Sequence, residues 1–236
     1  MPSTSPIILI LGAGPNIGQN VARVFAAKGY KVALAARSLK EEDSTASQLH
    51  IKSDFSKPEE IVSAFAKVRK ALGIPSVVVY NAASLTASPA DDPFAIEIDG
   101  FKRDMTIGTT SAFVAAQQAV LGFRELPNDA ARSFFYTGNI LNVTIIPGFV
   151  SAGASKSASA HIINAAAAAY KDKGFNWIRF YYVDERKSDG SAKYRVDGDA
   201  HGKIFLELAE KKEQGPWLQT FVKDVGYQDF EGLYRL

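Results

Sequence analysis

A glycine-rich segment near the N-terminus has the residue types that hold a phosphate group. It reads Gly12-Ala-Gly-Pro-Asn-Ile-Gly18 and follows the apolar run 7–11. Glycines let a backbone approach a pyrophosphate, and a helix that begins here offers unpaired N–H groups. The spacing fits G-x-x-x-G-x-G with Asn16 in the middle, where its tolerance of a left-handed backbone suits the turn. The segment predicts a dinucleotide site, with a tight turn that holds no ligand as the alternative. The expected contacts come from Gly12, Gly14, Asn16, Ile17 and Gly18.

The end of the next predicted strand indicates which dinucleotide the site prefers. Arg37 and Ser38 follow this strand directly, and no acidic residue occurs before Glu41. A site for NAD places a carboxylate near this point to accept the ribose hydroxyls, whereas an arginine can pair with a 2′-phosphate. We therefore expect NADP(H) rather than NAD(H), with Arg37 and Ser38 at the 2′-phosphate. A solvated surface position for Arg37 is the alternative.

Further candidates for chemistry lie at the ends of two later predicted strands. Tyr136 and Asn139 end the first of these strands, and Tyr182 and Glu185 lie at the end of the second. Side chains at such strand ends face the ligand cleft and can exchange protons with a substrate. Core packing is the alternative for the tyrosines. A structural salt bridge is the alternative for Glu185, which belongs to the charged run Asp184-Glu-Arg186.

The order of elements predicts a scaffold that brings these strand ends together. Strands with continuous apolar runs alternate with helical patterns, which is typical of a parallel sheet covered on both faces. We expect one domain over residues 1–236, an α/β fold with a doubly wound parallel sheet of the Rossmann type and about seven strands. The predicted strands are 7–11, 31–36, 48–52, 76–80, 132–136, 176–183 and 217–222, and the predicted helices are 16–28, 59–72, 100–123, 151–173 and 200–212.

The composition limits which classes of binding partner and cofactor are expected. The 236 residues carry a formal net charge of +2, which is too small to favour nucleic acid or a membrane surface. Cysteine is absent and no histidine or acidic grouping has the spacing of a metal site, so neither a disulfide nor a metal centre is expected. No apolar run approaches a membrane span and no basic leader segment is present, so we expect a cytoplasmic protein.

Nearly the whole chain resembles the short-chain dehydrogenase/reductase family. The family turn T-G-x-x-x-G-x-G is here Leu11-Gly12 through Gly18, and the family N-A-G is Asn81-Ala82-Ala83. The acidic residue that contacts adenine in this family matches Asp54 after the third strand. The resemblance implies that Asn81 steadies the central strand, and that the backbone of Asn81 and Ala82 lies near the cofactor ribose.

The same resemblance assigns four catalytic positions, and only the lysine is retained. The family motif Y-x-x-x-K is here Ala152-Gly-Ala-Ser-Lys156, while Asn139 stands at the family serine and Gly108 at the family asparagine. In carbonyl reduction the tyrosine phenol protonates the developing alkoxide and the lysine holds the nicotinamide ribose. The resemblance therefore implies that Lys156 binds ribose. The reaction would then use a relocated proton donor, for which Tyr182 and Glu185 are candidates, or none, and Asn139 is a further candidate catalytic residue at the family serine position.

Two functions follow from this pattern. The first is an oxidoreductase that uses NADP(H) on a small organic substrate with a non-standard active site. The alternative is an inactive NADP-binding protein that serves as a regulator or scaffold. The resemblance also implies a homodimer or homotetramer that pairs through the two long helices, where the alanine run 165–169 permits close packing.

Overall fold

The computed structural model describes residues 5–127, 130, 132–171 and 178–230. In this part of the chain eight strands form one sheet in the order β3-β2-β1-β4-β5-β6-β7-β8. All neighbours from β3 to β7 pair in parallel, and β8 pairs antiparallel with β7. The doubly wound α/β fold is confirmed; the expected count of seven strands missed β8, which is only two residues long. The strands are β1 (Ile7–Leu11), β2 (Lys31–Ala36), β3 (Gln48–Lys52), β4 (Val77–Tyr80), β5 (Ser133–Thr137), β6 (Arg179–Arg186), β7 (Leu218–Val222) and β8 (Gly226–Tyr227).

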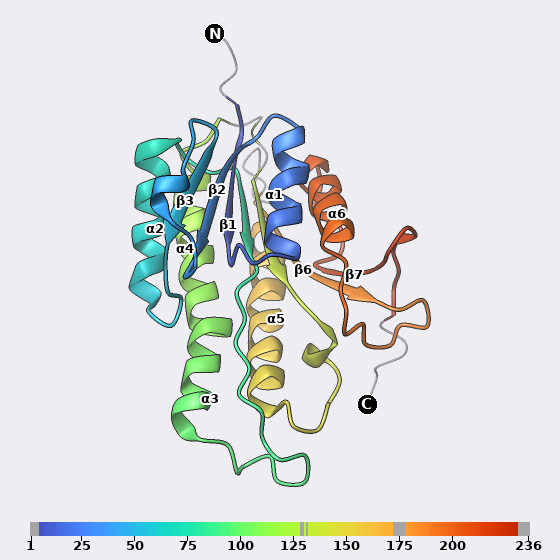
Figure 1. Ribbon diagram of the computed structural model, residues 1–236. Helices are drawn as coiled ribbons and strands as arrows, with labels where there is room; N and C mark the ends of the chain where they lie inside the picture. Colours follow the sequence, from blue (N-terminus) through green and yellow to red (C-terminus); the bar gives the residue numbers. More distant parts are fainter. Residues whose placement is uncertain (1–4, 128–129, 131, 172–177, 231–236) are drawn as a thin grey trace.

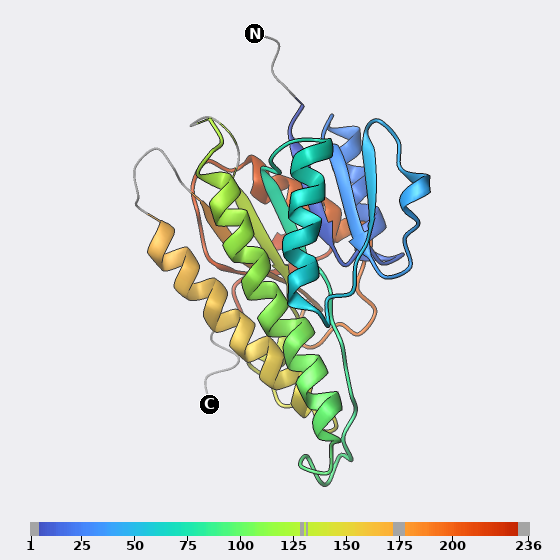
Figure 2. The ribbon, with the colours of Figure 1, turned by 90° about the vertical axis from the view of Figure 1, so that its left-hand side faces the viewer.

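Helices cover both faces of the sheet, as the continuous apolar strands predict (Figures 1 and 2). Every residue of β1 is buried, and successive residues alternate between two separate hydrophobic clusters. One cluster packs against α2, α4 and α5, and the other packs against α1 and α6. The helices are α1 (Ile17–Ala27), α2 (Pro58–Ala71), α3 (Ile98–Met105), α4 (Ser111–Phe123), α5 (Val150–Tyr170) and α6 (Gly198–Glu210).

The helix predicted over 100–123 is two helices joined by a π-helical turn, Thr106–Thr110. Gly108 lies in this turn, and its carbonyl accepts hydrogen bonds from the Tyr136 hydroxyl at 2.9 Å and the Ser159 hydroxyl at 2.8 Å. A π-turn widens the helix and frees backbone carbonyls for such partners. The prediction of one uninterrupted helix was wrong because these partners come from β5 and α5.

Strand β6 runs three residues beyond the predicted end at 183, so Asp184, Glu185 and Arg186 lie inside the strand and are buried. The pairing with β7 continues to Arg186 and Val222. Buried charges are tolerated when they are paired, and each of these has a partner. The other boundaries differ from the predictions by at most two residues where they are described. The predicted strand start at 176–177 and helix end at 172–173 lie outside the described residues.

Candidate active site

The phosphate turn between β1 and α1 leaves its backbone donors accessible. Gly12 has a φ of +101°, and a Cβ at this position would lie 2.4 Å from the Ala82 nitrogen, so glycine is required. A Cβ on Gly14 would meet open space. Within the described part of the chain, the N–H groups of Ile17 and Gly18 have no acceptor. The turn can therefore donate hydrogen bonds to an anionic group at the start of α1.

Asn16 does not adopt the left-handed backbone that the sequence predicts. Its φ is −88°, and its side chain is held by distant partners. The Asn16 amide nitrogen donates to the Val196 carbonyl at 3.0 Å, and its amide oxygen accepts from the Gly198 N–H at 3.1 Å. These bonds explain the difference, because Asn16 fastens the first residue of α6 to the phosphate turn.

Two further cofactor candidates, Arg37 and Asp54, lie at the carboxyl ends of β2 and β3. The side chains of Arg37 and Ser38 are exposed, and that of Asp54 is half-buried. A hydrogen bond from the Ser56 N–H is the main cause that lowers the pKa of Asp54, and the nearby Arg37 charge lowers it further. Arg37 and Asp54 therefore face the same region. In the described residues the Arg37 guanidinium has no carboxylate within ion-pair distance.

Asn81 links two central strands at the same edge of the sheet. Its side-chain amide donates to the Gly12 carbonyl at 2.8 Å, and its backbone N–H donates to the Leu11 carbonyl at 2.7 Å. The Ala82 N–H donates to the same Leu11 carbonyl at 3.1 Å. These bonds fix the end of β4 against the phosphate turn. The geometry agrees with the steadying role that the resemblance implies for Asn81.

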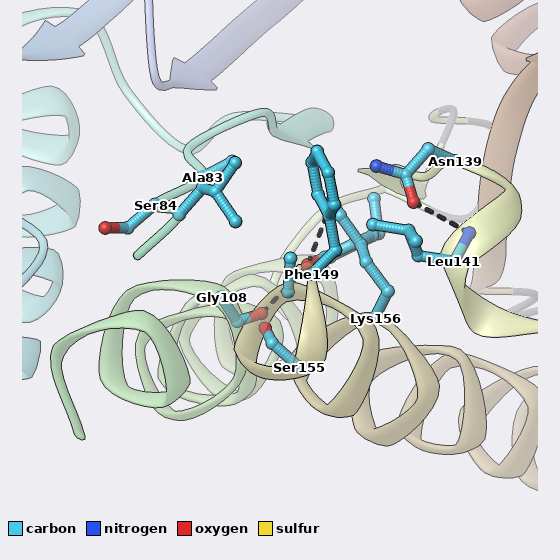
Figure 3. Close-up of a pocket in the computed structure, with 11 residues that line it drawn as sticks. Ala83, Ser84, Gly108, Asn139, Leu141, Phe149, Ser155 and Lys156 are labelled. Atoms are coloured by element: carbon cyan, nitrogen blue, oxygen red, sulfur yellow. Dashed lines mark hydrogen bonds between the residues drawn. The ribbon is translucent and has the colours of Figure 1, made fainter. Parts of the chain in front are cut away.

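Lys156 lies at the floor of a cavity of about 220 Å³ (Figure 3). Its ammonium donates to the Thr137 carbonyl at 2.8 Å and lies 3.4 Å from the Tyr136 hydroxyl. Lys156 is 7% exposed, and Ala152 lines the cavity one helical turn before it. The cavity is lined by Ala83, Ser84, Leu85, Gly108, Tyr136, Asn139, Leu141, Phe149, Ala152, Ser155 and Lys156. Ala152 thus leaves open a space that borders a lysine ammonium and a tyrosine hydroxyl.

Asn139 and Gly108, which the sequence resemblance assigns to the family serine and asparagine, make other contacts in the structure. The Asn139 side-chain oxygen accepts from the Leu141 N–H at 3.1 Å and caps the short helix Ile140–Asn142. At Gly108 a Cβ would lie 1.9 Å from the Ser155 hydroxyl oxygen and 3.1 Å from the Ser155 Cβ, so a side chain here would require Ser155 to move. Figure 3 shows Gly108 next to Ser155 and Asn139 turned toward Leu141. Asn139 and Gly108 therefore both take part in the packing around this cavity.

A second cavity, of about 340 Å³, adjoins the first and shares Lys156 and Asn139 with it. Asp184, Glu185 and His201 line this second cavity together with Ile17 of the phosphate turn. Burial raises the pKa of Asp184 to about 6, although the Arg186 guanidinium 2.5 Å away opposes the rise. Lys156 is one of five residues that line both cavities, with Ala83, Asn139, Leu141 and Phe149.

The Glu185 carboxylate is fully engaged inside this second cavity. It lies 2.6 Å from the Lys193 ammonium and accepts from the Asp197 N–H at 2.6 Å. The His201 Nδ1 is 2.8 Å from the Asp197 carbonyl and 3.6 Å from Glu185, and burial lowers the pKa of His201. Glu185 thus orders the segment that leads from β6 into α6.

Tyr182 lines neither of these two cavities. Its hydroxyl donates to the Asn139 carbonyl at 2.9 Å and accepts from the Asn139 N–H at 3.2 Å. Its ring stacks on that of Tyr136 with centroids 5.5 Å apart, and burial raises the pKa of Tyr182 well above its ordinary value. Tyr182 therefore positions Asn139 from within the core.

In the described residues no helix is both long and apolar enough to cross a membrane. Nor do three or more of their histidine, aspartate or glutamate side chains gather where they can hold a metal ion.

The sheet order and the cleft at its carboxyl edge define a Rossmann-type domain. The family model described as Enoyl-(Acyl carrier protein) reductase matches residues 12–206. A short-chain dehydrogenase/reductase of Cryptosporiopsis sp. (strain 8999) is 47% identical over 239 residues, which cover 96% of each chain. The chain belongs to the short-chain dehydrogenase/reductase family, a family of oxidoreductases that bind nicotinamide cofactors.

Solved structures share the fold at low sequence identity. A short-chain dehydrogenase/reductase from Serratia marcescens BCRC 10948 aligns with a TM-score of 0.74 and 18% identity, and covers 94% of this chain and 98% of its own. A metagenomic short-chain oxidoreductase in complex with NADP aligns with a TM-score of 0.77 and 16% identity, and covers 93% of this chain and 99% of its own.

Proposed function

We propose that this protein is an NADP(H)-dependent oxidoreductase that acts on a small organic substrate through an atypical active site. The observation that carries the proposal is the position of Lys156, where two cavities meet at the edge that also holds the phosphate turn. A dinucleotide fits this edge, because Gly14 faces open space and, in the described residues, Ile17 and Gly18 offer unpaired N–H groups.

Each end of the dinucleotide has residues suited to it. The N–H groups at the start of α1 would hold the pyrophosphate, and Arg37 would pair with the 2′-phosphate. Asp54 lies where it would contact adenine, and the Lys156 ammonium would donate to the nicotinamide ribose. When bound, a reduced nicotinamide supplies the hydride for the reaction. The metagenomic relative of the same fold holds NADP, which supports the choice of dinucleotide.

The substrate would occupy the smaller cavity beside Ala152. The ordinary phenol of the family is not available at this position, Gly108 offers no side chain, and Asn139 offers an amide where the family has a hydroxyl. The chain's own contribution there is the positive charge of Lys156, which stabilises negative charge that develops on a substrate oxygen. The rebuilt site still borders the cofactor cleft, which favours catalysis over the alternative of an inactive scaffold.

The exposed faces of α4 and α5 would form the interface between copies of the chain. Phe113 is 46% exposed and Leu121 is 55% exposed on α4, and a cavity of about 560 Å³ lies between the two helices. Apolar residues gathered on one face of two adjacent helices favour a protein partner. A second copy of the chain on this face would give the homodimer or homotetramer that the sequence predicts.

Replacing Arg37 by alanine is expected to remove most of the preference for NADPH over NADH. A hydrogen bond to a charged group contributes about 1.5–3 kcal/mol, which is roughly ten- to a hundred-fold in affinity. Titration by fluorescence or calorimetry should show NADPH bound more tightly in the unmodified protein and nearly equal affinities in Arg37→Ala. The exposed Lys40→Ala is the matched control and should keep the preference. Equal affinities in the unmodified protein would overturn the choice of NADP(H).

A further inference from the structure

The space beside Ala152 has the volume and the lining of a site for an aromatic ring. Leu85, Leu141 and Phe149 line it with apolar groups, and the Tyr136 hydroxyl and the Lys156 ammonium provide polar groups. Its volume is about 220 Å³. An engineered apolar cavity of about 150 Å³ binds benzene, so this space is large enough for a ring that carries one further group.

The positive charge of Lys156 determines which polar group on such a ring would bind best. An ammonium has three N–H donors, and in the described residues the Thr137 carbonyl accepts one at 2.8 Å, while the contact with the Tyr136 hydroxyl is long, at 3.4 Å. One donor can therefore serve the nicotinamide ribose and another a substrate oxygen. Among the described residues no carboxylate lies within ion-pair distance of Lys156. The nearest acid to face it, Asp184, is already paired with Arg186. A buried ammonium with an N–H donor available favours a weakly acidic hydroxyl on the ligand, because the positive charge stabilises the ionised form of that hydroxyl.

We propose that the substrate carries an aromatic hydroxyl, and that its phenolic ring fills the space beside Ala152 with the hydroxyl against Lys156. The substrate then brings the phenol that this chain lacks at position 152. This inference rests on the proposed function and names the substrate class for the same site.

The proton balance of the step is simple. The phenolic O–H bond breaks, and its proton goes to the substrate oxygen on which negative charge develops as the carbonyl is reduced. The phenolate that remains lies next to the Lys156 ammonium, and a solvent proton restores the hydroxyl. The two electrons are those of the reduced nicotinamide named in the proposed function. The sum is a carbonyl, NADPH and one proton giving an alcohol and NADP⁺.

A binding experiment tests this proposal without relying on turnover. We would measure the Kd of 4-fluorophenol and of 4-fluorotoluene by ¹⁹F NMR on the full chain in the presence of saturating NADP⁺. The phenol is expected to bind about ten-fold or more tightly than the toluene, since a hydrogen bond to a charged group is worth this much. Lys156→Met should remove the difference between the two probes. Equal Kd values in the unmodified protein would overturn the proposal.

Variants that fill the space give an independent readout. Ala152→Phe should weaken 4-fluorophenol at least about ten-fold, because its ring takes the same volume, and Ala152→Leu serves if Ala152→Phe does not fold. The exposed Ser157→Phe on the same helix is the matched control and should leave the probe affinity unchanged. Probe binding unaffected by either Ala152 variant would contradict the site. If NADP⁺ itself does not bind the unmodified protein, the proposed function fails, and the two failures are thereby distinguished.

Discussion

Replacing Arg186 by methionine is expected to lower the free energy of unfolding by about 3–5 kcal/mol. The Arg186 guanidinium is 1% exposed and lies 2.5 Å from the buried Asp184 carboxylate inside β6. Removing one partner of a buried ion pair leaves the other charge uncompensated, which accounts for a loss of this size. Chemical denaturation monitored by circular dichroism at pH 8 measures it directly.

The pH dependence of that loss identifies Asp184 as its cause. The folded pKa of Asp184 is about 6, above the ordinary value near 4, with Lys156, Glu185, Arg186 and Tyr182 as the ionisable groups around it. A raised acid pKa means that stability falls as the pH rises from about 4 to about 6. Without Arg186 the folded pKa rises further and the fall continues above pH 6, so the loss should be greater at pH 8 than at pH 5.

A buried arginine without a carboxylate partner provides the control. Arg179 is 5% exposed and donates to the Ala209 carbonyl at 3.1 Å. The loss in Arg179→Met should therefore be similar at pH 5 and pH 8. A loss in Arg186→Met that does not change with pH would show that Asp184 is not the group left uncompensated.

Simple ketones and aldehydes without an aromatic hydroxyl are expected to be reduced little or not at all, even at saturating NADPH. General acid catalysis typically contributes about 10²–10⁴-fold, and the cavity is lined by Ala152, at the position where the sequence resemblance implies a phenol. Ala152→Tyr places a phenol one helical turn before Lys156. Alone it should restore little, because the Asn139 side-chain oxygen is engaged in capping and Gly108 has no side chain to contribute. NADPH oxidation followed by absorbance is the measurement.

The second substitution tests whether the groups act together. Adding Asn139→Ser to Ala152→Tyr should raise the rate by more than the two single changes combined, as expected for residues that share one step. Ala152→Phe is the matched control, with the same ring and no hydroxyl, and should restore nothing. Rapid reduction of simple ketones by the unmodified protein would refute this account and move the search for the acid to Tyr136 or Glu185.

The parts of the fold that depend on local pattern were predictable from the sequence. The alternation of apolar strands and helices gave the sheet, and the glycines at 12 and 18 marked the turn because close backbone contacts exclude a side chain there. Asn16 was misjudged, since its backbone is set by side-chain bonds to Val196 and Gly198, far along the chain. No local pattern reports such a contact.

The candidate site was predictable only in part for the same reason. Lys156 was identified by its motif, but its contact with Tyr136 joins α5 to β5 and leaves no signal in the spacing. The charged run 184–186 was predicted to lie at the end of β6, with a structural salt bridge as the alternative to a functional site. The structure places the run inside the strand, where Asp184 pairs with Arg186 and Glu185 with Lys193, and the spacing alone does not reveal these pairs.

The most direct test of the central claim is a crystal structure of the protein with NADP⁺. We expect the pyrophosphate at the N–H groups of Ile17 and Gly18, and the 2′-phosphate on the Arg37 guanidinium. The Lys156 ammonium should lie within hydrogen-bonding distance, about 2.7–3.2 Å, of a nicotinamide ribose hydroxyl. A dinucleotide bound away from the phosphate turn, or one whose ribose does not contact Lys156, would contradict the account.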